Sequence, residues 1–154
     1  MLRNKYINFC LALGFASLSY AETDPLAVAT LQRSLETEEA LDLSDRNLGE
    51  IEAKAIAEVL LKNPSLVSLD LSKNNISDEE AAGIAEALVK NSKLQSLDLS
   101  DNLLVGSKSA EAFIKLLATN KTLRTLKLNN TKITDSELIS INKLLVRNKK
   151  LLGR

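Results

Sequence analysis

The sequence predicts an α/β solenoid of four strand–helix units, a short right-handed arc with a parallel sheet on its concave side and helices on its convex side. The first observation is a repeat, because similar segments occupy 41–48, 69–76, 97–104 and 126–133. Their equivalent leucines lie 28, 28 and 29 residues apart, at Leu43, Leu71, Leu99 and Leu128. The second is a change of apolar period after each segment, from two to about 3.6, which indicates a strand followed by a helix.

Each unit should begin with a strand whose leucines face the core. Alternate residues of a strand point to opposite sides, so the spacing L-x-x-L-x-L places the leucines on one face. An asparagine follows the strand in the two middle units, at Asn74 and Asn102. Its amide is expected to satisfy backbone groups where the chain turns the corner. Arg46 and Thr131 replace it in the outer units, whose corners should be less regular.

Each strand should lead into a helix with one apolar stripe. Ser77-Asp78 and Thr134-Asp135 are typical helix starts. The expected stripe consists of Ile56, Leu60 and Leu61, then Ile84, Leu88 and Val89, then Phe113, Leu117 and Ala118, and finally Ile141, Leu145 and Val146. Asparagine recurs where each helix should end, as expected for a residue that tolerates left-handed geometry. These asparagines are Asn63, Asn91, Asn120 and Asn148.

The units resemble the ribonuclease-inhibitor class of leucine-rich repeats. The resemblance covers about residues 38–151 and rests on the period and on the motif L-x-x-L-x-L-x-x-N. It implies four such repeats over 38–154, with an incomplete C-terminal unit, and protein binding as the shared activity. The class includes nuclease inhibitors, GTPase activators, innate-immune sensors and bacterial effectors, and the fold alone does not choose among them.

Residues 1–21 have the features of a secretory signal peptide. A basic start precedes an apolar stretch, and Ser19 and Ala21 occupy the positions that a signal peptidase recognises. We expect cleavage after Ala21, because the apolar run is shorter than the ~20 residues that a retained membrane span requires. Residues 22–37 should form an N-terminal capping segment. The mature chain would be secreted or periplasmic, and the loss of Cys10 would leave no cysteine, which fits a bacterial origin.

The composition argues against catalysis. The chain has no His and a single Cys, so neither a Ser–His–Asp nor a Cys–His nucleophile can be assembled. The common zinc sites lack their ligands for the same reason. We predict no enzyme activity, no catalytic residue, no cofactor and no nucleic-acid partner, and no transmembrane segment in the mature chain.

The residues between the strand leucines should face solvent on the concave side and form three rows across the sheet. The rows are Asp42, Asp70, Asp98 and Lys127, then Ser44, Ser72, Ser100 and Asn129, then Asp45, Lys73, Asp101 and Asn130. Any single aspartate is explained by the solubility of an exposed strand, whereas the face as a whole predicts protein binding. Aligned carboxylates could also bind a metal ion, but the loop ligands of a calcium motif are missing, so we expect none.

Charge is distributed unevenly along the chain. Residues 22–61 carry 3 basic and 10 acidic side chains, whereas residues 107–154 carry 11 basic and 3 acidic ones. A basic C-terminal patch is predicted at Lys143, Arg147, Lys149 and Lys150. The sequence ends one turn into what would be a fifth strand, so the edge of the last strand should be open. This end would dock an acidic partner or the acidic end of a second copy; alternatively, the charge only keeps the edge soluble.

The sequence therefore predicts an exported module that recognises a host or envelope protein through its concave sheet face. The alternative is a self-assembling periplasmic or surface structural protein. A third hypothesis is a regulator of a GTPase or of another enzyme. It rests on family analogy alone, and the sequence contains no nucleotide-binding motif that would support it.

Overall fold

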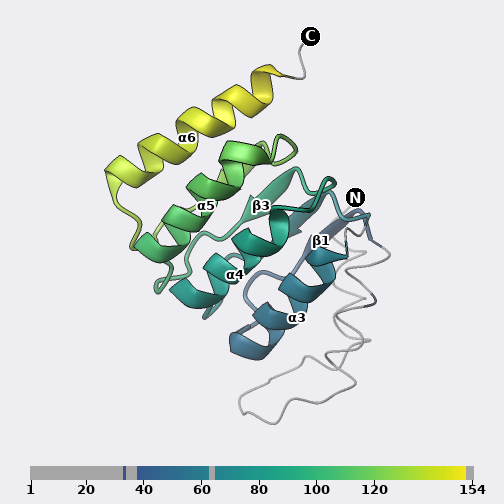
Figure 1. Ribbon diagram of the computed structural model, residues 1–154. Coiled ribbons are helices and arrows are strands. Elements are labelled where there is room, and N and C mark those ends of the chain that lie inside the picture. Colours follow the sequence, from purple (N-terminus) through teal and green to yellow (C-terminus); the bar gives the residue numbers. More distant parts are fainter. Residues whose placement is uncertain (1–32, 34–37, 63–64, 152–154) are drawn as a thin grey trace, which may run out of the picture.

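The computed structural model describes residues 33, 38–62 and 65–151 (Figure 1). The predicted leader, and the predicted capping segment apart from Arg33, lie outside the described residues. The elements in chain order are β1 (Ala40–Asp42), α3 (Glu50–Leu61), β2 (Ser68–Asp70), α4 (Asp78–Leu88), β3 (Ser96–Asp98), α5 (Ser107–Thr119), β4 (Thr125–Lys127) and α6 (Asp135–Lys150). Strands and helices alternate, as the change of apolar period predicts.

The strands form one parallel sheet in the order β1-β2-β3-β4, and the helices lie side by side on one face of it (Figure 1). Equivalent leucines pair in register, so that Leu41 lies beside Leu69, and Leu97 beside Leu126. A parallel connection must cross back over the sheet, and here each helix is that crossover. The predicted α/β leucine-rich-repeat solenoid is confirmed. None of the described helices is long and apolar enough to cross a membrane.

The core lies between the strand leucines and the helices, with Phe113 as its only aromatic residue among those described. The predicted helix stripe is right at two of its three positions in each unit. The third is wrong, because Leu61, Val89, Ala118 and Val146 are exposed. A residue five positions after Ile56 points about 140° away from it on a helix, whereas a residue three positions after it stays near the core side. Val59, Ala87 and Leu116 are accordingly the buried residues.

The corner after each middle strand depends on an asparagine amide, as predicted. The Asn74 carbonyl oxygen accepts hydrogen bonds from the backbone N–H groups of Arg46 at 2.9 Å and Leu48 at 3.0 Å. Its NH2 group donates to the carbonyls of Leu43 and Leu71, both at 2.9 Å. One buried side chain therefore satisfies polar groups of two successive units. Asn102 repeats this arrangement one unit later.

The outer corners differ, also as predicted. In the first corner both Asp45 and Asn47 adopt a left-handed conformation, with φ of 56°. In the last corner the Thr131 hydroxyl donates to the Leu128 carbonyl at 2.9 Å, in place of the asparagine amide that makes the equivalent bond within each middle unit. The last unit thus satisfies this carbonyl by itself.

A second set of asparagines lies at the opposite corner, and its predicted role is wrong. Asn91, Asn120 and Asn148 are buried, and none of them has a positive φ. The Asn120 NH2 group donates to the carbonyls of Leu88 and Asn91, and its oxygen accepts from the N–H groups of Thr122 and Leu123. These asparagines recur because they link successive units through their side chains. Asn148 lies within α6, and Asn63 lies outside the described residues.

The predicted helix starts are confirmed, and one of them also positions the next helix. Ser77 and Thr134 are the N-caps of α4 and α6. The Asp78 carboxylate accepts hydrogen bonds from the N–H groups of Gly106 and Ser109, at 2.9 and 2.8 Å, where α5 begins. Partial burial raises the pKa of Asp78, but these hydrogen bonds outweigh it and lower the pKa overall.

Replacing Asn102 by alanine should destabilise the fold strongly. The change removes the hydrogen-bond partner of the Ile76 N–H and of the Leu99 carbonyl, and it leaves the Leu71 carbonyl with Asn74 as its only amide donor. Since an unsatisfied buried group costs about 1–3 kcal/mol, we expect the free energy of unfolding in urea to fall by about 2–4 kcal/mol. The matched control is Asn142→Ala on the exposed side of α6, with an expected loss of about 0.5 kcal/mol or less. Equal losses for the two variants would contradict this role of Asn102.

Candidate functional site

The register of the sheet assembles the first predicted row on its concave side. Asp42 pairs with Asp70, Asp70 with Asp98, and Asp98 with Lys127. Adjacent parallel strands lie about 4.8 Å apart, so the side chains form one line of three carboxylates and an ammonium group. Exposure decreases along the line, from exposed Asp42 to Asp98, whose side chain is 13% exposed.

Each aspartate of this row also holds the backbone at the end of its strand. The carboxylates of Asp42, Asp70 and Asp98 accept hydrogen bonds from the N–H groups two residues later, at 2.9, 2.9 and 3.0 Å. The donors are Ser44, Ser72 and Ser100. A single aspartate is therefore explained by its local turn, and only the oxygen that remains free is available to a partner.

The row ends in an ion pair between Asp98 and Lys127. The Lys127 Nζ lies 2.9 Å from the Asp98 carboxylate, and the lysine side chain remains 56% exposed. Burial raises the pKa of Asp98, but the hydrogen bonds from Lys127 and Ser100 and the lysine charge outweigh it, so the pKa is lowered overall. The hydrogen bond and charge of Asp98 raise the pKa of Lys127. Both groups are thus charged at neutral pH.

The second and third predicted rows are only partly accessible. Ser100 is buried, whereas Ser44 and Ser72 are half-buried and Asn129 is exposed. In the third row Asp45, Lys73 and Asn130 are exposed, and Asp101 accepts a hydrogen bond from the Asn130 amide at 2.7 Å. All four residues of this row have a positive φ, because they form the corners. Their side chains therefore project from fixed turns at the rim of the sheet.

The sequence reasoning missed a further row on the same side of the sheet. Ala40, Ser68, Ser96 and Thr125 pair in register one position before the buried leucine of each strand. In the alternation of the strands they share the side of the aspartates. They occupy the free position before the second leucine of the motif, so the pattern itself was the signal. We define the concave face as these four rows. Among the described residues, no group of three His, Cys, Asp or Glu side chains is placed to hold a metal ion.

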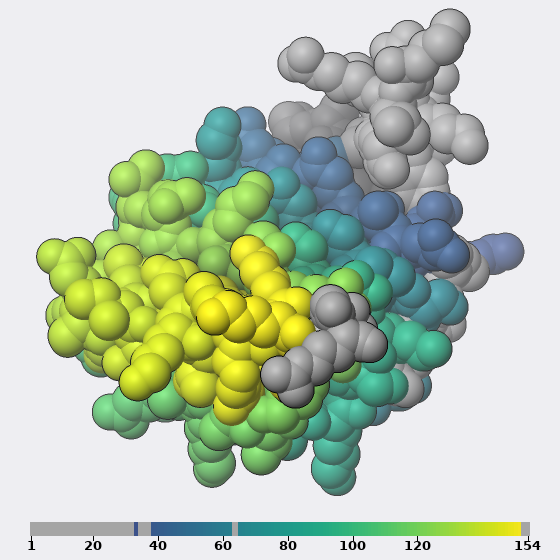
Figure 2. All heavy atoms as spheres, turned by 90° about the horizontal axis from the view of Figure 1, so that it is seen from above, coloured from purple at the N-terminus to yellow at the C-terminus, as the bar shows by residue number. Residues whose placement is uncertain are grey.

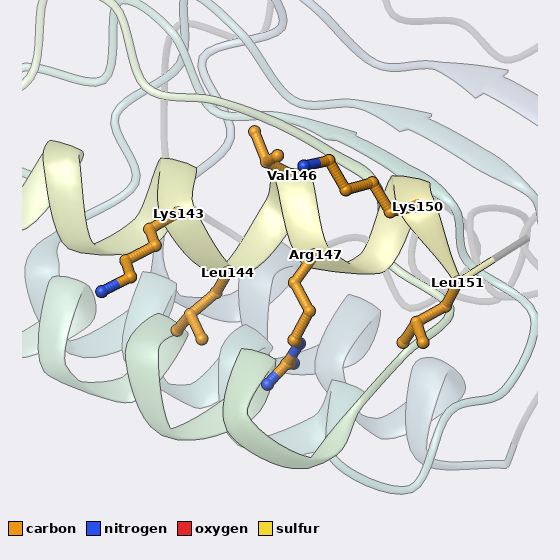
Figure 3. A pocket seen from close by; sticks show the side chains of 6 residues that line it. All are labelled: Lys143, Leu144, Val146, Arg147, Lys150 and Leu151. Atoms are coloured by element: carbon orange, nitrogen blue, oxygen red, sulfur yellow. The ribbon is translucent and has the colours of Figure 1, made fainter.

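The basic C-terminal patch lies on α6, at the end of the solenoid. The residues of α6 form the outer surface of this end, far from the first unit (Figure 2). Lys143, Arg147 and Lys150 line a surface hollow of about 530 Å³ together with Leu144, Val146 and Leu151 (Figure 3). Lys149 is exposed outside this hollow.

Arg147 differs from the lysines of the patch because its guanidinium group is engaged in the fold. It points with Leu144 toward the neighbouring helix α5 (Figure 3). There it donates to the Leu117 carbonyl, and it also donates to the side-chain oxygen of Asn148. The structure thus brings the predicted patch together but gives Arg147 a structural role, so the accessible charges are those of Lys143, Lys149 and Lys150.

Comparison with known proteins agrees with this architecture. A family model described as "Leucine Rich repeat" matches residues 62–85, 90–113 and 119–141. The structure of the Leiomodin-1 actin-binding site 2 is similar, with 26% identity and a TM-score of 0.70, over 84% of this chain and 78% of that one. The tropomodulin C-terminal domain of Caenorhabditis elegans has a TM-score of 0.68 at 12% identity, over 85% of this chain and 96% of that one. Among curated proteins no sequence match was found.

The repeats, the parallel sheet and these similar structures define a leucine-rich-repeat solenoid, an architecture that commonly serves protein binding. The chain is a leucine-rich-repeat protein. Its strand–helix period of 28–29 residues is the one that carries the resemblance to the ribonuclease-inhibitor class.

Asp98→Asn should remove stability that depends on pH. Because the folded-state pKa of Asp98 is lowered, its contribution is present above the unfolded value of about 3.9 and is lost as the pH falls through the folded value. Asparagine keeps an acceptor for Ser100 but not the charge that faces Lys127. We expect the variant to lose about 1 kcal/mol at pH 7, and the difference from the native chain to shrink toward pH 2. Urea titrations across this range measure it, with exposed Glu111→Gln as control. A difference that does not change with pH would contradict the assignment.

Proposed function

We propose that this chain is an exported binding module that recognises a protein partner through its concave face. The observation that carries the proposal is the line of carboxylates and hydroxyls that the register assembles on the open side of the sheet. Rigid strands hold these groups at fixed spacing, so little side-chain freedom is lost on binding. The concave face carries no aromatic anchor, so polar and charge complementarity would determine which partner binds.

Export would determine the compartment in which this module acts. The proposal rests on the leader-like residues 1–21 and places the mature chain in the periplasm, in the medium or in contact with a host. The partner would then be an envelope or host protein with basic and hydroxyl groups that match the aspartates. Intact mass of the chain recovered from the exported fraction of a secreting host tests this step. A chain starting at Glu22 is expected, and exported material that retains Met1 would contradict cleavage.

A second candidate partner is actin. The similar Leiomodin-1 structure is described as an actin-binding site, and it aligns with most of this chain at 26% identity. Co-sedimentation of the chain with actin filaments, and gel filtration with monomeric actin, test this candidate. Absence of a complex in both experiments would remove it and leave the other partners in place.

The alternative to partner binding is self-assembly driven by charge. The described first unit, 38–62, carries 7 acidic and 3 basic side chains, whereas residues 120–151 carry 8 basic and 2 acidic ones. Contacts between opposite ends would weaken as salt shortens the Debye length from about 10 Å at 0.1 M to about 3 Å at 1 M. Sedimentation at low and high salt distinguishes the two functions, because a monomer at every concentration excludes self-assembly.

Asp70→Asn with Asp98→Asn should weaken partner capture without unfolding the chain. Asparagine retains an acceptor for the Ser72 and Ser100 N–H groups but removes two charges from the concave face. A photo-crosslinking residue at Ser72 would identify the partner, and its affinity for the double variant should fall by about tenfold. The control is Glu79→Gln with Glu86→Gln, which makes the same charge change on the exposed side of α4. Equal affinity of both variants for the partner would move the site away from the sheet.

A further inference from the structure

The edge of β4 repeats a hydrogen-bonding pattern that every earlier strand uses to hold its successor. The Leu43 and Asp45 N–H groups donate to the carbonyls of Asp70 and Ser72, at 2.8 and 3.0 Å. Leu71 and Lys73 donate in the same way to the next strand, at 2.8 and 2.9 Å, and Leu99 and Asp101 donate to β4, at 2.9 and 2.8 Å. Two amides, two residues apart, therefore face the following strand in each of these units.

In the last unit the equivalent amides are those of Leu128 and Asn130. Among the described residues neither has a backbone hydrogen-bond acceptor. The Arg124 carbonyl likewise has no backbone donor among the described residues, whereas its equivalents at Val67 and Gln95 accept hydrogen bonds from the following strand. This edge thus presents two donors and one acceptor at the spacing that a further strand satisfies in every preceding unit.

A groove of about 540 Å³ runs along this edge, between β4 and α6. Its apolar lining includes Leu126, Leu128 and Ile133, which are 8%, 5% and 7% exposed, whereas the equivalent Leu97 and Leu99 are fully buried. Among the described residues, these side chains lie at the end of the hydrophobic core. On the neighbouring surface of α6, Ile139 is 69% exposed. A segment lying in the groove would bury apolar surface as well as satisfy backbone groups.

The charge of the edge indicates which segment fits. Lys127 lies on β4 with Asp98 on one side of it, and its other side faces the groove. Lys132 and Lys143 are exposed in the same unit, although neither lines the groove, and Asp135 is the one acidic residue of the groove lining. The pairing of β3 with β4 supplies the template, since Leu97-Asp98-Leu99 lies beside Leu126-Lys127-Leu128 in register.

We propose that the free edge of β4 binds an extended segment of a partner protein as a fifth strand, with an acidic residue between two apolar ones. The apolar residues of that segment cover Leu126, Leu128 and Ile133, and the acidic residue pairs with Lys127 opposite Asp98. The Leu128 and Asn130 amides donate to its backbone. This surface adjoins the end of the concave face and shares Lys127 and Asn130 with it, but its binding groups are the backbone of β4 and the groove beside α6.

The test uses a peptide with the sequence of this chain's own residues 93–102, KLQSLDLSDN, added to the full chain. In hydrogen-exchange measurements by NMR, the amides of Leu128 and Asn130 should exchange rapidly in the free chain and become protected when the peptide is added. The amides of Leu99 and Asp101 should be protected throughout. No binding at millimolar peptide, or protection elsewhere without protection of Leu128 and Asn130, would overturn the proposal.

A charge exchange tests the predicted ion pair. Lys127→Glu should weaken peptide binding by about tenfold, and the peptide KLQSLKLSDN should bind this variant better than it binds the native chain. Lys149→Glu makes the same charge change on α6 outside the groove and should leave the affinity within about twofold. Thermal unfolding shows whether the Lys127 variant is folded, and Lys127→Gln replaces it if it is not. An equal response of both lysine variants would overturn the assignment.

The same experiment distinguishes a separate partner from a second copy of this chain as the source of the fifth strand. β1 and the residue after it carry Leu41-Asp42-Leu43, which is the required pattern. If Leu128 and Asn130 gain protection in the free chain as its concentration rises, the occupant is another copy and the proposal of a separate partner is overturned. Protection that depends only on the peptide supports it.

Discussion

A solenoid turns a corner twice in every unit, and each corner turns backbone polar groups away from the sheet and from the helix. Buried without partners, each such group would cost about 1–3 kcal/mol, which a chain of this size cannot bear repeatedly. In this protein two columns of asparagine amides meet the requirement. Asn74 and Asn102 serve the corner after the strands, and Asn91 and Asn120 serve the corner after the helices. Each amide contacts its own unit and the preceding one, so the columns also set the register of the parallel sheet.

The same requirement explains why the concave face is polar. Asp42, Asp70 and Asp98 accept the N–H groups of the serines that follow them, so their position on the face is fixed before any partner arrives. Groups held in this way lose little freedom on binding, which favours recognition by geometry and charge over recognition by large apolar anchors. The fold and the binding surface therefore share the same side chains, and Ser100, which is buried, belongs mainly to the fold.

The leucine spacing predicts the strands and, because it repeats at a fixed period, their register. The asparagines that follow the strands also predict amides that satisfy the corners, even though Asn74 bonds groups 26 to 31 residues away. The apolar pattern fails at Leu61 and Val89, since a stripe was extended to a helix position that points to solvent. The role of Asn120 was missed because its partners at Leu88 and Asn91 lie 32 and 29 residues away. The engagement of Arg147 with the Leu117 carbonyl, 30 residues away, was missed for the same reason. Sequence patterns predict local geometry, whereas contacts between units require the structure.

The hydrogen bonds at the C-terminal ends of the two asparagine columns differ from those in the middle units. Thr131 satisfies the last corner by its own hydroxyl, and Arg147 donates to the Asn148 oxygen that would otherwise accept from the backbone. The interior amides are the central constraint on this fold, and hydrogen exchange of the asparagine side-chain NH2 groups tests this most directly. The NH2 protons of Asn102 and Asn120 should exchange slowly, because they are exposed only by extensive unfolding. Those of exposed Asn142 should exchange within the dead time of the measurement. Rapid exchange at Asn102 and Asn120 would contradict the account.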